Sequence, residues 1–245
     1  MYFNQGFLGY LPNQSLKFLG TDTEEIFRSN LKSLPTDWYY RTADITYNHN
    51  SLGHRSPESD TLNLDNYILF TGCSHTQGSG LELEKTYPYI VADSLGCDYY
   101  NLALGGTGID AMIHNLSLWL AKVNQKPWAI VVQWPDEARF QLVVNRQLRS
   151  MGSWTKRTHI SRFLTAGSYN GFFSSRKKIA SEFINSFSDH IKIINVGINF
   201  DSHTTENMAD TLCMPLNLDR ARDLEHFGII SNQVLAKNIT TRLNK

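Results

Sequence analysis

The alternation of short apolar runs with longer amphipathic stretches is the clearest pattern in the chain. The run YILFTG begins at Tyr67 and WAIVVQW follows Pro127, and both have the length and composition of buried strands. Between them, the DYYNLAL run favours another strand, and apolar residues recur at helical spacing over Thr86–Leu95 and Ile109–Val123. Gly96 supplies a stop for the first of these helices. The order strand, helix, strand, helix, strand predicts a parallel sheet with helices on both faces.

The same rhythm returns towards the C-terminus after a less regular stretch. Periodicity predicts a helix over Ser175–Phe187, a strand at IKIINVG and a final helix over Phe227–Leu243, with a polar loop from Asn199 to about Arg222 before that helix. Residues 136–170 mix arginines and aromatic residues without a clear period. We expect this stretch to be an insertion or cap with helical parts.

The first 60 residues differ in composition from the rest. They carry many Asn, Ser, Thr, Tyr and Gly residues, and only Glu24–Leu34 is amphipathic. We expect residues 1–60 to form an irregular lead-in that packs over the sheet edge near the site. A length of 245 residues fits a single large domain, which we place at residues 61–245.

The charge balance and the apolar runs exclude several classes of partner. Lys and Arg together number 23, as do Asp and Glu, so no net field attracts nucleic acid or an anionic membrane surface. No apolar run approaches the roughly 18 residues of a membrane helix. The start lacks the features of a signal peptide, and Cys73, Cys97 and Cys213 fit neither a disulfide framework nor a zinc ribbon. We expect the cytoplasm or another reducing compartment, while the oligomeric state stays open.

The segment after the first apolar run carries the first candidate for chemistry. In GCSHTQG, residues 72–78, the glycines permit a tight turn that exposes the hydroxyl of Ser74, and a nearby base can activate it. Backbone N–H groups close to the next helix can point at a developing oxyanion. His75 adjoins Ser74, but neighbours on a turn usually point apart, so we expect the base elsewhere. The alternative is a Ser/Thr/Gly loop without catalytic consequence.

The second candidate lies in DLEHFG, residues 223–228, just before the final helix. In a tight turn, Asp223 can bring its carboxylate to Nδ1 of His226, which leaves Nε2 free for a hydroxyl. Asp219 is the second choice for this acid because it lies farther from His226 in the sequence. The alternative is that Asp223 caps the final helix and His226 packs beside it. We expect both segments to meet at one edge of the sheet, where sites converge.

Together these segments resemble the SGNH, or GDSL-like, serine hydrolases. GCSHTQG resembles their first block, usually Gly-Asp-Ser-x-Thr-x-Gly, and DLEHFG resembles their last, Asp-x-x-His. The run NLALGG, residues 101–106, resembles the second block, whose last glycine is here Gly106. The resemblance covers about residues 66–243. In addition, NHNSLGHR, residues 48–55, resembles the N-x-x-G-x-R lead-in of some bacterial and phage members.

The resemblance implies a fold, a site and an activity. The fold is an α/β three-layer α/β/α sandwich with a central parallel, flavodoxin-like sheet. Ser74, His226 and Asp223 form the catalytic triad, and the N–H groups of Ser74 and Gly106 form the oxyanion hole. The chemistry is acyl transfer to and from the serine, which requires no metal and no organic cofactor.

Two positions depart from the family pattern. Cys73 replaces the Asp before the nucleophile, which is outside the triad, and a Gly-Cys-Ser variant is familiar in the superfamily. The third block, usually Gly-x-Asn-Asp, is absent, and QWPDEARF, residues 133–140, stands in its place. Gln133 could replace the missing Asn as an oxyanion donor, or Arg139 could supply a cationic one. Alternatively, Gln133 forms a hydrogen bond with a backbone group at the strand end, and Arg139 pairs with the carboxylate of Asp136 or Glu137 on the surface. Losing one such donor typically lowers turnover about 10²–10³-fold.

The sequence therefore predicts a serine esterase or acyl hydrolase that cleaves a small acyl ester, for example O-acetyl on a carbohydrate. Two alternatives remain: an acyltransferase with the same triad, and a weak or inactive glycan-binding or structural module, since the third-block Asn is missing. The fold itself does not choose the substrate. As for a metal, only Asp201 and His203 are closely paired, and a solvated loop is the preferred interpretation.

Overall fold

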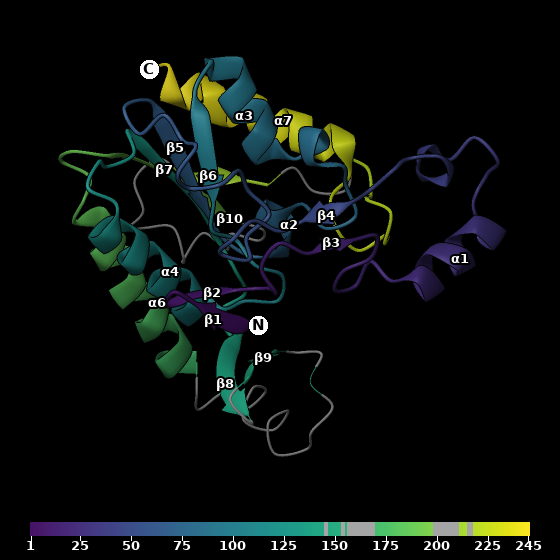
Figure 1. The fold of residues 1–245 in the computed structure, drawn as a ribbon, viewed down its shortest axis with the longest axis horizontal. Coiled ribbons are helices and arrows are strands. Elements are labelled where there is room, and N and C mark those ends of the chain that lie inside the picture. Colours follow the sequence, from purple (N-terminus) through teal and green to yellow (C-terminus); the bar gives the residue numbers. More distant parts are fainter. Residues whose placement is uncertain (145–146, 153–154, 156–169, 198–210, 215–217) are drawn as a thin grey trace.

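The fold is built around a central parallel sheet. A computed structural model of the chain describes residues 1–144, 147–152, 155, 170–197, 211–214 and 218–245. The sheet has five strands in the order β11-β10-β7-β5-β6 (Figure 1), and every neighbouring pair is parallel. The strands are β5 (Tyr67–Thr71), β6 (Asp98–Asn101), β7 (Ala129–Trp134), β10 (Lys192–Gly197) and β11 (Thr211–Cys213). Counted along the chain, this is the 2-1-3-4-5 order of flavodoxin-like folds, so the expected fold class is confirmed.

Helices cover both faces of the sheet, as the apolar strands require. Successive side chains of a strand point to opposite faces, and in β5 the side chains of Ile68 and Phe70 pack on one face while those of Tyr67 and Leu69 pack on the other. The first face is covered by α3 (Tyr87–Leu95) and α7 (Ile229–Leu243), and the second by α4 (Ile109–Lys122) and α6 (Asn170–Asn185) (Figure 1). All five residues of β5 are buried because both faces are covered.

The predicted ends of a helix agree closely with the structure where the residues that start and stop it are adjacent in sequence. Helix α3 starts within one residue of the prediction, with Pro88 in its first turn. It ends at Gly96, whose φ of +61° is left-handed and whose N–H bonds to the last carbonyls of the helix. The polar loop expected over 199–222 is partly wrong, because β11 lies within it and extends the sheet by one strand. Residues 198–210 and 215–217 of that stretch lie outside the described part of the chain.

The stretch expected to be an insertion contains a hairpin. Strands β8 (Phe140–Val144) and β9 (Gln147–Met151) pair antiparallel. The hairpin lies close to the start of α4, since a Cβ on Gly108 would meet the backbone of Arg139 and Phe140. The described residues between 136 and 152 contain no helix, and residues 153–154 and 156–169 lie outside the described part, so the expected helical parts stay a prediction.

The N-terminal 60 residues contain short elements joined by turns. They are the hairpin β1 (Tyr2–Asn4) and β2 (Phe7–Gly9), the paired strands β3 (Ser15–Leu16) and β4 (Tyr47–Asn48), helix α1 (Glu24–Ser33) and the 3₁₀ turn η1 (Tyr39–Arg41). Helix α1 starts where Thr23 accepts a hydrogen bond from the N–H of Ile26, an N-cap that its sequence favours. In Figure 1, α1 projects away from the three layers.

This N-terminal segment lies against β6, the edge strand of the sheet. Asn50 donates to the hydroxyl of Tyr100 (3.0 Å), and Ser56 Oγ accepts from the N–H of Asn101 (2.9 Å). The buried ring of His54 accepts from the same tyrosine at Nδ1 and donates to a backbone carbonyl at Nε2. These hydrogen bonds join residues 50–56 to the edge strand. Within the described ranges, no helix combines the length and apolar character needed to cross a bilayer.

Candidate active site

Ser74 occupies the first position of the short helix α2 (Ser74–Gln77), directly after β5. The sheet order reverses between β5 and β7, and the crevice at the carboxyl ends of such strands is where α/β folds place their sites. The turn into α2 leaves no room for a side chain at residue 72, because a Cβ on Gly72 would meet Thr76 and Gln133. Gly78, with a φ of +82°, then ends the helix in the left-handed region. The chain therefore turns sharply on both sides of the serine.

A chain of short hydrogen bonds joins Ser74 to two residues from the far end of the sequence. Ser74 Oγ lies 2.7 Å from Nε2 of His226, and Nδ1 of His226 lies 2.6 Å from Oδ2 of Asp223. The other carboxylate oxygen of Asp223 accepts from the N–H groups of Glu225 (3.1 Å) and His226 (3.0 Å). All three side chains of the chain belong to buried residues. The structure thus brings the two predicted segments together in the predicted arrangement.

The charge on Asp223 determines which nitrogen of His226 carries the proton. Burial by itself raises the pKa of Asp223, but hydrogen bonds from the side chain and backbone of His226 and from Thr21 outweigh it and lower the pKa to about 2. An ionised carboxylate can only accept hydrogen bonds, so Nδ1 of a neutral His226 must be the donor. Nε2 is then an acceptor, and Ser74 donates to it. This geometry can move the hydroxyl proton to the imidazole.

The turn that presents Asp223 and His226 is followed by α7, and Asp219 binds the start of that helix. The N–H of Ala221 donates to the carbonyl of His226 (2.9 Å), which closes the turn. Asp219 accepts from the N–H groups of Ile230 (2.8 Å) and Ser231 (2.9 Å) at the start of α7. Asp219, the second choice for the orienting acid, therefore satisfies free N–H groups at the start of the final helix, and Asp223 is the residue bound to the imidazole.

The loop after β6 runs beside Ser74. Asn101 donates to the carbonyl of Thr76 (2.8 Å), which ties this loop to α2. A Cβ built on Gly105 would lie 3.9 Å from Cβ of Ser74. Gly106 has a left-handed φ of +72°, which suits glycine. Since Ser74 is the first residue of its helix, its N–H has no acceptor within the helix. Gly105 therefore lies against the side chain of Ser74, and the N–H of Ser74 is left without a partner inside α2.

Gln133 is placed differently from the expectation. Its Oε1 accepts from the N–H of Cys73 (3.0 Å), from the thiol of the same residue (3.0 Å) and from Thr76 Oγ1 (3.3 Å). Its Nε2 donates to the carbonyl of Trp134 (2.7 Å), and the residue is completely buried. The expectation that Gln133 is an oxyanion donor is corrected, because its amide holds the turn before Ser74 instead.

Arg139, considered above either as a cationic donor or as the partner of a surface carboxylate, lies near the site. Glu137 pairs with Lys177 (2.8 Å), and Asp136 accepts from the N–H of Ala138 (2.8 Å). The guanidinium of Arg139 is close enough to His75 to affect the pKa of that imidazole. Its proposed role as a cationic donor stays a prediction.

His75 packs on the imidazole that contacts Ser74. Its ring centroid lies 4.7 Å from that of His226 and 4.6 Å from that of Phe227. Burial lowers the pKa of His75 well below its usual value, and repulsion from His226 and Arg139 acts in the same direction. A neutral His75, stacked on Phe227 and tilted against the ring of His226, fits the expectation that His226, and not its neighbour, contacts the hydroxyl.

Sequence reasoning missed the support that the N-terminal segment gives to this site. Thr21 donates to Oδ2 of Asp223 (2.7 Å), which is the same oxygen that binds His226. Next to it, Asp22 binds the buried guanidinium of Arg222 through two hydrogen bonds of 2.9 and 2.7 Å. The only signal for this support in the sequence was Arg222, which precedes the predicted acid Asp223. A buried arginine needs an acidic partner, but the sequence did not indicate which one.

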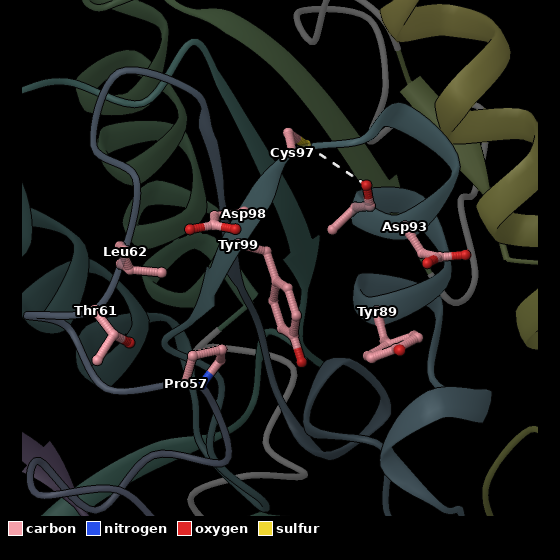
Figure 2. Close-up of a pocket in the computed structure, with 9 residues that line it drawn as sticks. Pro57, Thr61, Leu62, Tyr89, Asp93, Cys97, Asp98 and Tyr99 are labelled. Atoms are coloured by element: carbon pink, nitrogen blue, oxygen red, sulfur yellow. Dashed lines mark hydrogen bonds between the residues drawn. The ribbon is translucent and has the colours of Figure 1, made fainter.

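A separate cavity of about 310 Å³ lies at the amino end of the edge strand (Figure 2). Its lining consists of Pro57, Thr61, Leu62, Tyr89, Ala92, Asp93, Cys97, Asp98 and Tyr99. Ser74 follows the carboxyl end of β5, which is parallel to β6, so the cavity lies towards the opposite end of the sheet. Neither serine nor histidine lines it, and it offers no pair for acyl transfer.

The described residues contain no cluster of three or more His, Cys, Asp and Glu side chains that could hold a metal ion. Asp201 and His203, considered above as a metal pair, lie outside the described part of the chain. What the structure does bring together is the serine, the imidazole and the carboxylate.

Comparison with known proteins finds similarity only at the level of structure. No protein-family model matches the chain, and no curated protein matches it in sequence. A family 2 carbohydrate esterase from Myceliophthora fergusii is 15% identical with a TM-score of 0.48, over 74% of this chain and 67% of that one. The acetyl xylan esterase Est2A from Butyrivibrio proteoclasticus is 16% identical with a TM-score of 0.45, over 73% and 63%. The esterase EstA from Pseudoalteromonas sp. is 12% identical with a TM-score of 0.45, over 74% and 100%.

The matched part of this chain thus spans about two thirds of the two carbohydrate esterases. All three TM-scores are below 0.5. The function of this chain therefore has to be argued from the geometry of its own site.

Proposed function

We propose that this chain is a serine esterase or acyl hydrolase of the SGNH type, with Ser74 as nucleophile, His226 as general base and Asp223 as the orienting acid. One observation carries the proposal: the Ser74–His226–Asp223 hydrogen-bond chain is continuous, with links of 2.7 and 2.6 Å. These separations are within the range that a nucleophile and its base need.

In the proposed mechanism, His226 takes the proton of Ser74 as the serine oxygen attacks the ester carbonyl. Asp223, ionised because its pKa is lowered to about 2, holds Nδ1–H and offsets the positive charge that forms on the ring. His226 then gives the proton to the departing alcohol, which leaves an acyl group on Ser74. Water, deprotonated by the same imidazole, releases the acid and restores the serine.

The negative oxygen of the tetrahedral intermediate is proposed to bind the N–H groups of Ser74 and Gly106. The start of α2 supports the first of these donors, and the close approach of Gly105 to Ser74 supports the second. With Gln133 turned to Cys73 and Trp134, the side-chain donor usual in the family has no replacement at that position. We therefore expect slow turnover.

The proposed substrate is an ester of a small acyl group on a neutral alcohol, such as O-acetyl on a carbohydrate. Equal numbers of acidic and basic residues give the protein no net charge with which to recruit an anionic substrate. A series of p-nitrophenyl esters from acetate to octanoate tests the acyl preference, which we expect to favour acetate. Transfer of acetyl to an added sugar instead of water would point to the acyltransferase alternative.

The central test combines labelling with hydrolysis. A fluorophosphonate probe followed by peptide mapping should modify Ser74, and Ser74→Ala should lose both labelling and p-nitrophenyl acetate hydrolysis. Ser79→Ala is the matched control, because Ser79 is also buried and lies one turn further on. Equal hydrolysis by wild type and Ser74→Ala, or labelling at another residue, would end the esterase proposal.

The position of Gln133 favours a second candidate, a catalytically weak or inactive module that uses this fold to bind a glycan. Loss of one oxyanion donor costs about 10²–10³-fold in turnover. An inactive wild type that still binds an acetylated oligosaccharide in calorimetry would favour this candidate over the esterase.

A further inference from the structure

The N-terminal segment contacts the Asp223 carboxylate directly. Thr21 Oγ1 donates to Oδ2 of Asp223 at 2.7 Å and lies 3.5 Å from Nδ1 of His226. Oδ2 therefore accepts two hydrogen bonds, one from the threonine and one from the imidazole, while Oδ1 accepts two from backbone N–H groups. Together these four bonds satisfy the carboxylate, whose two oxygens offer about four acceptor positions.

Thr21 is held in place by its neighbours on both sides. The backbones of Leu19 and Asp22 bond to each other (2.9 and 3.2 Å), which closes a turn with Thr21 inside it. Asp22 then forms its two hydrogen bonds to Arg222. Two consecutive residues of the N-terminal segment thus bind two consecutive residues of the C-terminal turn, Asp22 to Arg222 and Thr21 to Asp223.

We propose that Thr21 is a positioning residue for the Asp223–His226 pair, so that the N-terminal segment supplies a fourth member of the hydrogen-bond chain that begins at Ser74. Its hydroxyl fixes the orientation of Oδ2, and Oδ2 in turn fixes the ring of His226. Its effect on catalysis rests on the proposed esterase function, whereas its effect on the hydrogen bond between Asp223 and His226 does not.

The test uses Thr21→Val, Thr21→Ser and Thr21→Ala. Valine keeps the shape of threonine but removes the donor, serine keeps the donor, and alanine leaves space for a water molecule. Because hydrogen bonds to charged groups are stronger than neutral ones, we expect Thr21→Val to lower kcat at least about tenfold with KM unchanged. Thr21→Ser should retain wild-type kcat, and Thr21→Ala should fall between the two.

A second readout does not depend on activity. The Nδ1 proton of His226, held between nitrogen and carboxylate, is followed by its downfield proton resonance. Thr21→Val should shift this resonance and Thr21→Ser should not. Thr21 is exposed at the surface, so these variants remove no core contact. Thr42→Val, at another exposed threonine of the same segment, is the control and should change neither kcat nor the resonance.

The two readouts separate failure of this proposal from failure of the esterase proposal. Wild-type kcat and an unshifted resonance in Thr21→Val would overturn the role of Thr21. If the wild type is inactive, the resonance alone decides: a shift in Thr21→Val supports the positioning role, and no shift overturns it. A shift of equal size in Thr42→Val would also overturn it, because the effect would then be general to the segment.

Discussion

Replacing Asp22 by Asn removes one partner of a buried ion pair that lies directly beside the proposed site. Asp22 is fully buried and Arg222 is 4% exposed. The two carboxylate oxygens bind Nε and one terminal nitrogen of the guanidinium, and the hydroxyl of Tyr47 donates to Oδ2 at 2.5 Å. Asparagine keeps the shape of the side chain but leaves the guanidinium without a counter-charge.

The size of the effect follows from the burial of the pair. Breaking a buried ion pair by removing one partner costs about 3–5 kcal/mol, since the remaining charge stays desolvated. Arg222 cannot move readily into solvent, because its guanidinium lies over the neighbouring rings of Phe18 (4.6 Å to the ring centroid) and Phe27 (5.3 Å). A domain has a total stability of about 5–15 kcal/mol, so Asp22→Asn should remove a large part of it.

Urea denaturation followed by circular dichroism measures the loss in free energy of unfolding. The matched control is Asp44→Asn, because Asp44 pairs with Lys17 at 2.5 Å but both side chains are more than half exposed. We expect no resolved change in the control, since water screens such pairs. A loss below about 1 kcal/mol in Asp22→Asn, the range of exposed pairs, would refute the argument that burial makes this pair important.

Four further predictions concern the site. Asp223→Asn should lower kcat for p-nitrophenyl acetate about 10⁴-fold, because an amide favours the wrong tautomer of the imidazole. The lowered pKa of Asp223, about 2 against an ordinary 3.8, stabilises the folded protein by about 2 kcal/mol above pH 4, and this contribution is lost as the pH falls through about 2. The stability difference between wild type and Asp223→Asn, measured by urea titration, should shrink over that interval. Tyr10→Phe removes the acceptor of the Gly105 N–H (3.0 Å) and should lower kcat more than it raises KM. Gln133→Ala should lower the free energy of unfolding by about 1–3 kcal/mol, because the buried N–H of Cys73 loses its acceptor.

Each of these has a contradicting outcome. Activity of Asp223→Asn within tenfold of wild type would remove the carboxylate from the proposed mechanism. A pH-independent stability difference would contradict the lowered pKa of Asp223. An unchanged kcat in Tyr10→Phe would mean that the Gly105 loop keeps its place without the tyrosine. Unchanged stability in Gln133→Ala would show that another group accepts the hydrogen bond from the N–H of Cys73.

The central strands and their helices were predictable because their signals are local. β5 and β7 are runs of apolar, β-favouring residues, and α3 carries its own proline and glycine boundaries. β11 was missed because it has three residues, too few for a pattern. The pairing of Asp223 with His226 was also predictable, since they are three positions apart and one turn can join them.

The meeting of Ser74 with His226 depends on more than local pattern. The two residues are 152 positions apart, and only the order of strands places their loops at one edge of the sheet. Family resemblance named both residues, but their 2.7 Å contact is a property of the fold.

Gln133 and Thr21 show most clearly what the sequence could not determine. The amide of Gln133 can donate or accept with equal chemical ease, and its direction depends on the turn at Cys73 that packs against it. Thr21 lies 202 residues from Asp223 in a segment without strong periodicity. By itself, the sequence determined the central strands, the helices that cover them and the chemical groups available for a reaction. The tertiary structure alone decided which polar groups satisfy one another, because that choice depends on distances between segments that no local pattern encodes.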